Sequence, residues 1–383
     1  MQVGVIKEQR TGELRVAITP ETVKKFVGMG LSVVIETKAG LTAAITDQSY
    51  KEAGANIVKT PDEALKNADI VLKVRKPIQS DGSGQNTEDE VKIMKAGAVL
   101  ICLMEPYSSQ ELIKILAKQN ITTFSMELIP RITRAQTMDT LSSQSNLAGY
   151  KAVLEAAHVF GRAFPMMMTA AGTVPPAKCL VMGAGVAGLQ AIATARRLGA
   201  VVSASDVRPA AKENVESLGA SFVAVEDEEF QQAETAGGYA KEMSDEYKEK
   251  QAELIASTVA KQDIVICTAL IPGRPAPVLV TAEMVKTMRP GSVLVDLAAE
   301  QGGNCPLSVP DKTIIKNGVS IIGQTNLASA VAIDASILFA KNLLSFVSLM
   351  INQEDNQLVI DIADEIIKES LLTNNGEVIQ AFT

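Results

Sequence analysis

The chain has 383 residues, of which 47% are hydrophobic, and a formal net charge of −8. This length favours two domains, and the apolar content is large enough to fill a core in each of them. The acidic balance argues against binding to nucleic acid and against direct contact with an anionic membrane surface.

The first third of the chain alternates short apolar runs with helical patterns. Strict alternation of this kind predicts a parallel sheet with helices on both faces. The expected strands are residues 3–6, 32–36, 56–58, 69–74, 98–103 and 121–126. The expected helices are residues 21–29, 48–53, 61–67, 88–95 and 109–119.

A polar segment follows the last of these strands. Residues 130–139 include Arg131, Arg134, Gln136 and Asp139. Small-molecule sites concentrate in clefts between domains, and these side chains could hold a carboxamide and a ribose by hydrogen bonds. The alternative is a helix cap with surface ion pairs. Residues 144–164 then show helical spacing, which predicts a long helix linking two domains.

The strongest motif comes next. An apolar run at residues 179–182 leads into Gly183-x-Gly185-x-x-Gly188, and a helical pattern and a second apolar run end at Asp206. This order is typical of the dinucleotide-binding βαβ unit, in which the glycines permit a tight turn, close approach to a pyrophosphate and close helix–strand packing. The helix N-terminus offers free N–H groups to the phosphates. We therefore predict a dinucleotide site here.

Asp206 favours NAD(H) over NADP(H). A carboxylate at the end of the second strand accepts hydrogen bonds from the ribose hydroxyls and repels a 2′-phosphate. Arg208 leaves the alternative open, because an arginine beside the acid is what a 2′-phosphate needs.

Further strands are expected at residues 221–225, 263–269, 292–298 and 319–323. The charged segment 226–253 contains Ala236-Gly237-Gly238-Tyr239, which we interpret as a mobile flap over the cofactor or as a solvated acidic insertion. The proline-rich loop 271–277 either lines the nicotinamide side of the site or only connects two elements.

An apolar helical run after residue 324 is interrupted by Asp334, Lys341 and Asn342. These residues argue against a membrane span, so we expect the helix to pack on the first domain. In the tail we expect short strands at residues 357–360 and 377–381. No signal peptide is expected, because an apolar strand pattern follows Met1 directly.

Groups for acid–base chemistry are scarce. The single histidine, His158, lies in an alanine-rich helical pattern that is more typical of packing or surface than of catalysis. Four basic residues at the strand ends of the first domain either bind an anion or pair with Glu8 and Glu13: Lys7, Arg15, Lys73 and Arg75. Glu300 follows a later strand and is expected at the same kind of sheet edge. The four cysteines show no metal-ligand spacing, which predicts buried free thiols in a reducing cytosol and no metal site.

Long stretches of the chain resemble one family. They are MELIPRITRAQTMDTLSSQSNLAGYKAV from Met126, FPMMMTAAGTVPPAKCLVMGAGVAGLQAIATARRLGA from Phe164, and TALIPGRPAPVL from Thr268. They are similar to the NAD(H)-binding component, often called domain I, of proton-translocating nicotinamide nucleotide transhydrogenase. The broader superfamily includes alanine dehydrogenase.

The resemblance implies an α/β fold with two Rossmann-like, doubly wound parallel-sheet domains joined by long helices. Residues 1–143 and 325–383 would form the first domain, and residues 144–324 the NAD(H)-binding domain, with a mobile loop near 226–253. It implies a homodimer with NAD(H) between the domains, and NADP(H) on a partner domain of the membrane-embedded subunits. A hydride would pass from NADH to NADP+, coupled to proton translocation. The chain would be cytoplasmic, peripheral to the bacterial membrane, and inactive without its partner.

The resemblance also implies site residues. Arg131, Gln136 and Asp139 would contact the nicotinamide and carry the catalysis by positioning it. The further cofactor contacts would be Ser142, Gly183, Gly185, Val186, Gly188, Asp206, Val207, Arg208, Gly238, Tyr239, Gln251 and Leu270.

The alternative function is NAD-dependent amino-acid oxidation, as in alanine dehydrogenase. That family relies on a histidine after the fifth strand and an aspartate before a Gly-Gly pair, whereas this chain has Cys102-Leu103-Met104 and Glu300. Transfer between two nicotinamides needs apposition of the rings and no general acid or base. A third interpretation is that the isolated chain is an NAD(H)-binding module, inert until its partner arrives.

Overall fold

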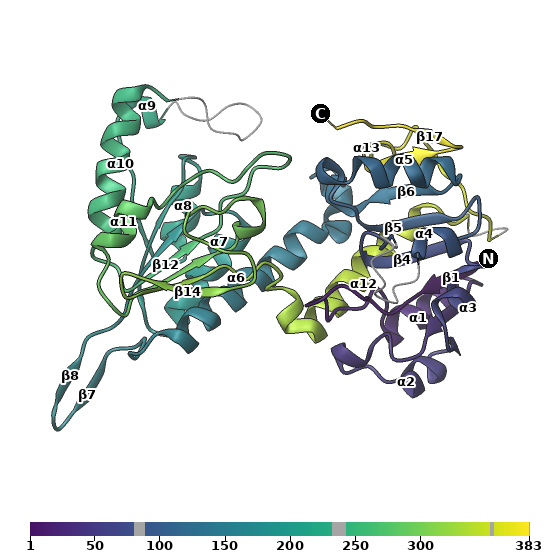
Figure 1. The fold of residues 1–383 in the computed structure, drawn as a ribbon, viewed down its shortest axis with the longest axis horizontal. Helices are drawn as coiled ribbons and strands as arrows, with labels where there is room; N and C mark the ends of the chain where they lie inside the picture. Colours follow the sequence, from purple (N-terminus) through teal and green to yellow (C-terminus); the bar gives the residue numbers. More distant parts are fainter. Residues whose placement is uncertain (80–88, 232–242, 353–355, 383) are drawn as a thin grey trace. The chain divides into compact units, whose positions relative to one another are not determined.

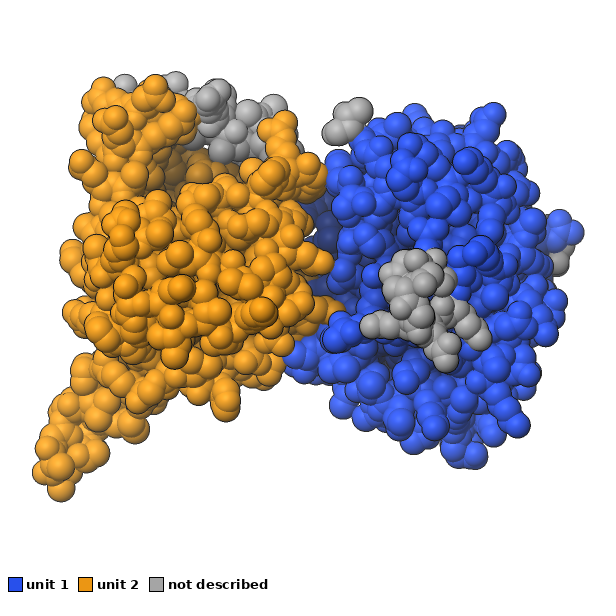
Figure 2. Space-filling model, in the orientation of Figure 1, with its two compact units in different colours: residues 1–144, 329–383 blue, residues 145–328 orange. Residues whose placement is uncertain are grey.

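The computed structural model describes residues 1–79, 89–231, 243–352 and 356–382. Their contacts divide the chain into two compact units, drawn in blue and orange in Figure 2. Unit 1 contains Met1–Gln144 and Ser329–Thr383, and unit 2 contains Ser145–Ala328. Each unit is built on its own large sheet.

Unit 1 has an eight-stranded sheet in the order β17-β16-β6-β5-β4-β1-β2-β3, and all neighbours from β6 to β3 pair in parallel (Figure 1). Its strands are β1 (Gln2–Val5), β2 (Ser32–Glu36), β3 (Asn56–Val58), β4 (Ile70–Arg75), β5 (Val99–Leu103), β6 (Thr122–Ser125), β16 (Leu371–Asn374) and β17 (Glu377–Val378). Its α-helices are α1 (Pro20–Gly28), α2 (Asp47–Glu52), α3 (Pro61–Leu65), α4 (Glu90–Ile93), α5 (Gln110–Lys118), α12 (Ala332–Leu349) and α13 (Glu365–Ser370).

Two cores cover the two faces of this sheet. In β4, Ile70 and Leu72 belong to one core and Val71 belongs to the other. Successive side chains of a strand point to opposite faces, so the sheet is buried on both sides. Helices α1 and α12 pack into the first core, and α5 packs into the second. All six predicted strands and the alternation of strands and helices are confirmed.

The C-terminal segment completes unit 1. Phe339, Leu343 and Phe346 of α12 are fully buried in the first core, and Phe346 meets Phe124 edge to face at 5.3 Å between ring centroids. The expected packing of this helix is therefore confirmed. The strand expected at residues 357–360 is wrong, because only an isolated bridge joins Ile351 to Leu358.

The last strand pair differs from the expectation. Strand β16, which pairs antiparallel with β6, was not predicted, because its four residues lead directly into the turn before β17. β17 itself is shorter than the expected 377–381.

Unit 2 has a seven-stranded sheet in the order β11-β10-β9-β12-β13-β15-β14, parallel except for the pairing of β14 with β15. Its strands are β9 (Lys178–Met182), β10 (Val201–Ser205), β11 (Ser221–Phe222), β12 (Ile264–Cys267), β13 (Val293–Asp296), β14 (Thr313–Lys316) and β15 (Val319–Ile322). Its helices are α7 (Val186–Arg197), α8 (Ala211–Ser217), α9 (Glu228–Gln231), α10 (Asp245–Val259), α11 (Ala282–Thr287) and most of α6 (Thr140–Val159).

This sheet also separates two cores. In β9, Cys179 and Val181 belong to one core, and Leu180 and Met182 to the other. The two double-sided sheets confirm the predicted α/β fold class with Rossmann-like, doubly wound sheets. Helix α6 begins in unit 1 and continues in unit 2, as the helical pattern indicated.

Several elements of unit 2 were not predicted, including the following three. The charged segment 226–253 contains the start of α10, capped by Ser244, so it is not one long loop. Strand β14 forms a hairpin with β15 around Asn317 and Gly318, both at positive φ. A two-stranded hairpin of β7 (Met167–Thr169) and β8 (Gly172–Val174) extends away from the rest of the unit in Figure 1.

Among the described residues, one helix, Ser329–Leu349, is long and apolar enough to cross a membrane by length and composition alone. The charges of Asp334 and Lys341 therefore do not exclude a span, contrary to the expectation. Half of its apolar window is buried inside the unit, which is the behaviour of a core helix.

The four cysteines provide a test of how tightly the cores of the two units are packed. Cys102, Cys179, Cys267 and Cys305 are all free and fully buried, and burial raises the pKa of the Cys179 thiol to about 12. Only thiolates react readily with aromatic disulfides. We expect no thiol of the folded chain to react with Ellman's reagent at pH 8, and all four to react after denaturation. Rapid reaction of any thiol in the folded chain would contradict this packing.

Candidate functional site

The glycine turn lies between β9 and α7. Gly183 has φ +101°, which disfavours any residue with a side chain, and a Cβ there would lie 2.7 Å from Thr268 Oγ1. A Cβ on Gly188 would lie 1.9 Å from the carbonyl oxygen of Gly183. Gly185 faces open space, because a Cβ at this position would have no neighbouring atom within 4 Å. Two of the glycines thus allow close packing, and the third leaves room for a ligand.

The first turn of α7 offers hydrogen-bond donors. Gly185 is its N-cap and has no side chain to accept a hydrogen bond. The N–H groups of Val186, Ala187 and Gly188 have no acceptor among the described residues. Unsatisfied N–H groups and the positive end of the helix dipole favour an anion at this position.

Asp206 follows the end of β10 and hydrogen-bonds to the glycine turn. Its side chain is 6% exposed, and its carboxylate accepts hydrogen bonds from the N–H groups of Ala184 at 2.7 Å and Arg208 at 2.9 Å. The guanidinium of Arg208 donates two more, each at 2.9 Å. Burial favours the neutral acid, but the bonds from Arg208 and Ala184 outweigh it and hold the pKa of Asp206 below its usual value. The carboxylate is therefore ionised at neutral pH.

The other predicted residues of unit 2 have different surroundings. Val207 is 64% exposed and Leu270 is 47% exposed, so both present apolar surface to solvent. Gln251 accepts a hydrogen bond from the N–H of Val225 at 2.8 Å, which connects α10 to the segment that follows β11. Gly238 and Tyr239 lie outside the described residues.

Sequence reasoning missed Asn304, which is fully buried and holds the loop that carries Leu270. Its side chain bonds both the N–H and the carbonyl of Ala269, at 3.1 and 2.9 Å, and the carbonyl of Pro277 at 2.8 Å. In the sequence it is only one member of a polar stretch after a strand, and no spacing marks it as a loop anchor.

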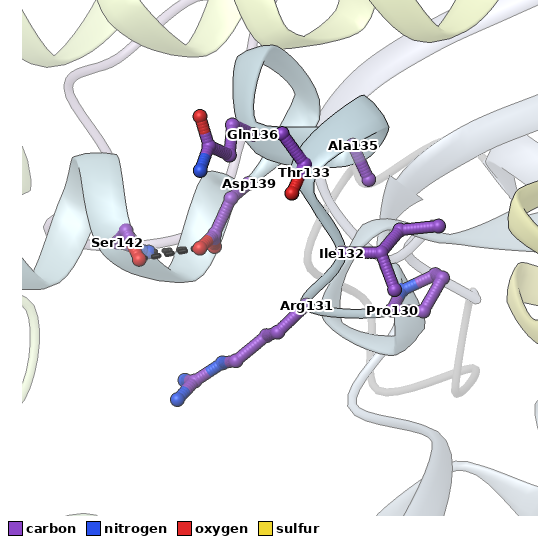
Figure 3. Close-up of a pocket in the computed structure, with 8 residues that line it drawn as sticks. All are labelled: Pro130, Arg131, Ile132, Thr133, Ala135, Gln136, Asp139 and Ser142. Atoms are coloured by element: carbon purple, nitrogen blue, oxygen red, sulfur yellow. Dashed lines mark hydrogen bonds between the residues drawn. The ribbon is translucent and has the colours of Figure 1, made fainter.

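The polar segment of unit 1 forms a second candidate site. Residues around the 3₁₀ turn η4 (Thr133–Met138) line a cavity of about 460 Å³. Figure 3 shows the lining residues: Pro130, Arg131, Ile132, Thr133, Ala135, Gln136, Asp139 and Ser142.

The predicted polar residues of this cavity divide into fixed and free groups. Asp139 accepts hydrogen bonds from the N–H of Ser142 at 2.8 Å and from its hydroxyl, and Figure 3 shows the two side chains pointing toward each other. The side chains of Arg131 and Gln136 are exposed and bond to no described residue. Arg131 extends away from Asp139 in Figure 3, so the two do not pair. Their free donors are available to a ligand.

The turn is anchored from the C-terminal segment. Asn342 of α12 donates to the carbonyl of Thr137 at 2.8 Å and accepts from the hydroxyl of Ser143 at 2.8 Å. Arg134 forms a bidentate ion pair with Asp364, with both bonds at 2.7 Å, so it is directed away from the cavity. The predicted surface ion pair thus applies to Arg134 alone among the polar residues of this segment.

Most charged residues at the strand ends of unit 1 are paired. Lys73 is buried between Glu8 at 3.3 Å and Glu90 at 3.2 Å. Burial alone would lower the pKa of Lys73, but the two carboxylates raise it and keep the ammonium charged. Arg15 forms an ion pair with Glu13. These groups build the fold and are not free to bind an anion.

Two residues considered for chemistry are exposed, namely His158 on α6 and Glu300 after β13. Within the described parts of the chain, no three metal-ligating side chains cluster.

Comparisons with known proteins match nearly the whole chain to the same family. Family models match at residues 4–148 (alanine dehydrogenase/PNT, N-terminal domain) and 152–381 (alanine dehydrogenase/PNT, C-terminal domain). The first segment of the divided alpha subunit of NAD(P) transhydrogenase from Rhodospirillum rubrum is 55% identical over 99% of this chain and 98% of its own. Alanine dehydrogenase of Methanococcus maripaludis is 32% identical over 99% of this chain and 94% of its own.

The solved structures include a crystal structure of transhydrogenase from Sinorhizobium meliloti. It is 53% identical, has a TM-score of 0.87, and the match covers 99% of this chain and all of that one.

The anchoring role of Asn342 can be tested by Asn342→Leu. This change removes the hydrogen bonds that Asn342 makes with the carbonyl of Thr137 and the hydroxyl of Ser143, which costs about 1–3 kcal/mol of unfolding free energy. Urea unfolding followed by circular dichroism measures the loss. Ser348→Ala is the matched control, because that hydroxyl bonds only to the carbonyl of Leu344 in the same helix. Equal unfolding free energies of the two variants would show that Asn342 does not anchor the turn.

Proposed function

Because the chain belongs to the alanine dehydrogenase/PNT family, we propose that it is the NAD(H)-binding component of a proton-translocating NAD(P) transhydrogenase. This proposal rests on the 55% sequence identity, over almost the full length of both chains, to the first part of a transhydrogenase alpha subunit. In this function a hydride passes between NADH held here and NADP+ held on a partner domain. The membrane subunits couple that transfer to proton movement.

The glycine turn suits the adenosine and pyrophosphate half of NAD(H). The N–H groups that begin α7 suit the pyrophosphate, and the space at Gly185 lets it approach the backbone. The ionised Asp206 suits the hydroxyls of the adenosine ribose, and Val207 offers apolar surface for the adenine. Residues 144–324 are accordingly the proposed NAD(H)-binding domain.

The polar segment of unit 1 suits the nicotinamide half. Arg131 and Gln136 offer free donors and an acceptor for the carboxamide, while Asp139 is fixed by Ser142. Leu270, which is 47% exposed, keeps its proposed place at the cofactor. Gly238 and Tyr239 keep their proposed role in closing over the nucleotide, and Gln251 its proposed place at the cofactor.

The scarcity of acid–base groups fits this reaction. Hydride transfer between two nicotinamides exchanges no proton at the reacting carbons, so orientation supplies the rate enhancement. NAD(H) provides the redox chemistry. The chain's own task is to hold the ring at a fixed angle and to exclude water, which Arg131, Gln136 and Asp139 perform by positioning.

The proposal includes partners. The chain forms a homodimer and binds the NADP(H)-binding domain of the membrane-embedded subunits. It lies on the cytoplasmic side of the bacterial membrane, peripheral to it, and transfers no hydride alone. Names of similar proteins as transhydrogenase subunits support the existence of such partners.

Amino-acid oxidation is the second candidate, favoured by the 32% identity to an alanine dehydrogenase. That reaction needs a group to move protons at the imine and amine. The segment Cys102-Leu103-Met104 holds no histidine, and Cys102 is fully buried with its pKa raised by burial. Purified chain should therefore show no alanine-dependent reduction of NAD+. Measurable reduction, followed by the absorbance of NADH, would favour this candidate.

Gln136→Asn tests the positioning role. Shortening the side chain by one carbon moves its amide from the carboxamide, so we expect hydride transfer to slow about ten- to hundredfold while NADH affinity changes little. Transfer is followed with an acetylpyridine analogue of NAD after mixing with an NADP(H)-binding partner, and affinity by NADH fluorescence.

Gln48→Asn is the control, because Gln48 is exposed and bonds only to Glu52. A large loss of NADH affinity in Gln136→Asn would make Gln136 a simple binding residue. Hydride transfer without any partner would contradict the proposed dependence on that partner.

A further inference from the structure

The carboxylate of Asp206 has no acceptor position left. An ionised carboxylate offers about four lone-pair positions. Ala184 and Arg208 occupy two of these with backbone N–H groups, and Nε and Nη2 of Arg208 occupy the other two. A ribose that is to bond Asp206 must therefore displace one of these donors.

Only the guanidinium can leave. The N–H of Ala184 is part of the glycine turn, where Gly183 N–H bonds the carbonyl of Ser205 at 2.8 Å. The N–H of Arg208 belongs to the bend before α8, where Ala211 N–H bonds the carbonyl of Arg208 at 3.1 Å. The side chain of Arg208 is 37% exposed, so it can rotate into solvent without disturbing a core.

We propose that Arg208 is an internal competitor of the nucleotide: its two N–H donors hold the positions on Asp206 that the two hydroxyls of a ribose require. Binding of a vicinal diol exchanges the fork of Arg208 for two O–H donors. This inference rests on the proposed NAD(H) site and assigns Arg208 a role that acts through Asp206.

The exchange sets both affinity and selectivity. Breaking a bidentate, charge-assisted ion pair opposes binding, because a neutral diol forms weaker bonds to the carboxylate. A ribose 2′-phosphate offers only one hydroxyl donor and a negative charge, so it cannot replace the fork. The ion pair between Arg208 and Asp206 then stays intact, and NADP(H) does not bind.

The competition predicts a gain of affinity on removing the guanidinium. Arg208→Met retains an apolar stem and leaves Asp206 with its two backbone donors. We expect it to bind NADH about two- to fivefold more tightly than the unchanged chain, the range for loss of a partly exposed ion pair. NADPH should remain weak, because the bare carboxylate repels its 2′-phosphate. Calorimetry or NADH fluorescence measures both.

Two comparisons separate competition from a general effect of charge. Arg197→Met removes an exposed arginine near the end of α7 that bonds to no described residue, and it should leave NADH affinity unchanged. An NADH analogue with a 2′-deoxyadenosine has one donor fewer, so its gain in Arg208→Met should be smaller than that of NADH.

The outcomes are distinct. Weaker or unchanged NADH binding by Arg208→Met would overturn the inference. Weaker binding would make Arg208 a direct contact of the nucleotide. If this variant is unfolded by circular dichroism, Arg208→Gln takes its place with the same expectation. Absence of NADH binding by the unchanged chain would instead overturn the proposed function.

Discussion

The close approach of helices at the glycine turn is the constraint on which unit 2 depends. A side chain on Gly188 would lie 1.9 Å from the Gly183 carbonyl oxygen, and one on Gly149 would lie 2.0 Å from the Ala187 carbonyl oxygen. Helix α7 is thus held by strand β9 on one side and by α6 on the other. Because both contacts are to backbone, neither can relax by moving a side chain. The start of α7, with its unsatisfied N–H groups, is therefore fixed in place.

The same turn connects the glycines to the acid of the motif. The Ala184 N–H, between Gly183 and Gly185, bonds the carboxylate of Asp206. A helix terminus that favours an anion and a carboxylate that favours hydroxyl donors are thereby set at a fixed separation. In the proposed function, that combination suits a ligand with a phosphate at one end and a diol at the other, which is the chemical form of an adenosine diphosphate moiety.

Much of this arrangement was predictable from the sequence. The central strands of both sheets and the glycine motif are long or regular enough to leave a clear periodicity. Strand β16 is not, because residues 371–374 gain their strand character by pairing with β6 and β17. The start of α10 was hidden by the charges of a solvated helix. The Asn317-Gly318 turn was a recognisable hairpin signal that would have found β14.

The site residues show where sequence reasoning ends. Asn342 was visible only as a polar interruption of an apolar run, yet it bonds a turn far earlier in the chain, at Thr137. Arg208 was visible as a neighbour of Asp206, but its bidentate geometry depends on a rotamer that no spacing encodes. Arg131 and Arg134 look alike in sequence, and only the position of Asp364 separates the free arginine from the paired one.

The distribution of partners explains why this chain suits positioning better than proton chemistry. Lys73, Glu8, Glu13 and Arg15 lie at the edge where α/β sheets bind ligands, but they are buried and paired with one another. A buried and paired charge cannot exchange a proton with a substrate without breaking its ion pair, which is strongly unfavourable. The free side chains of Gln136 and Arg131 offer amide and guanidinium donors, which orient a ligand. In the proposed function, a chain built in this way holds a redox nucleotide at a set angle, while the proposed partner supplies the acceptor for its hydride.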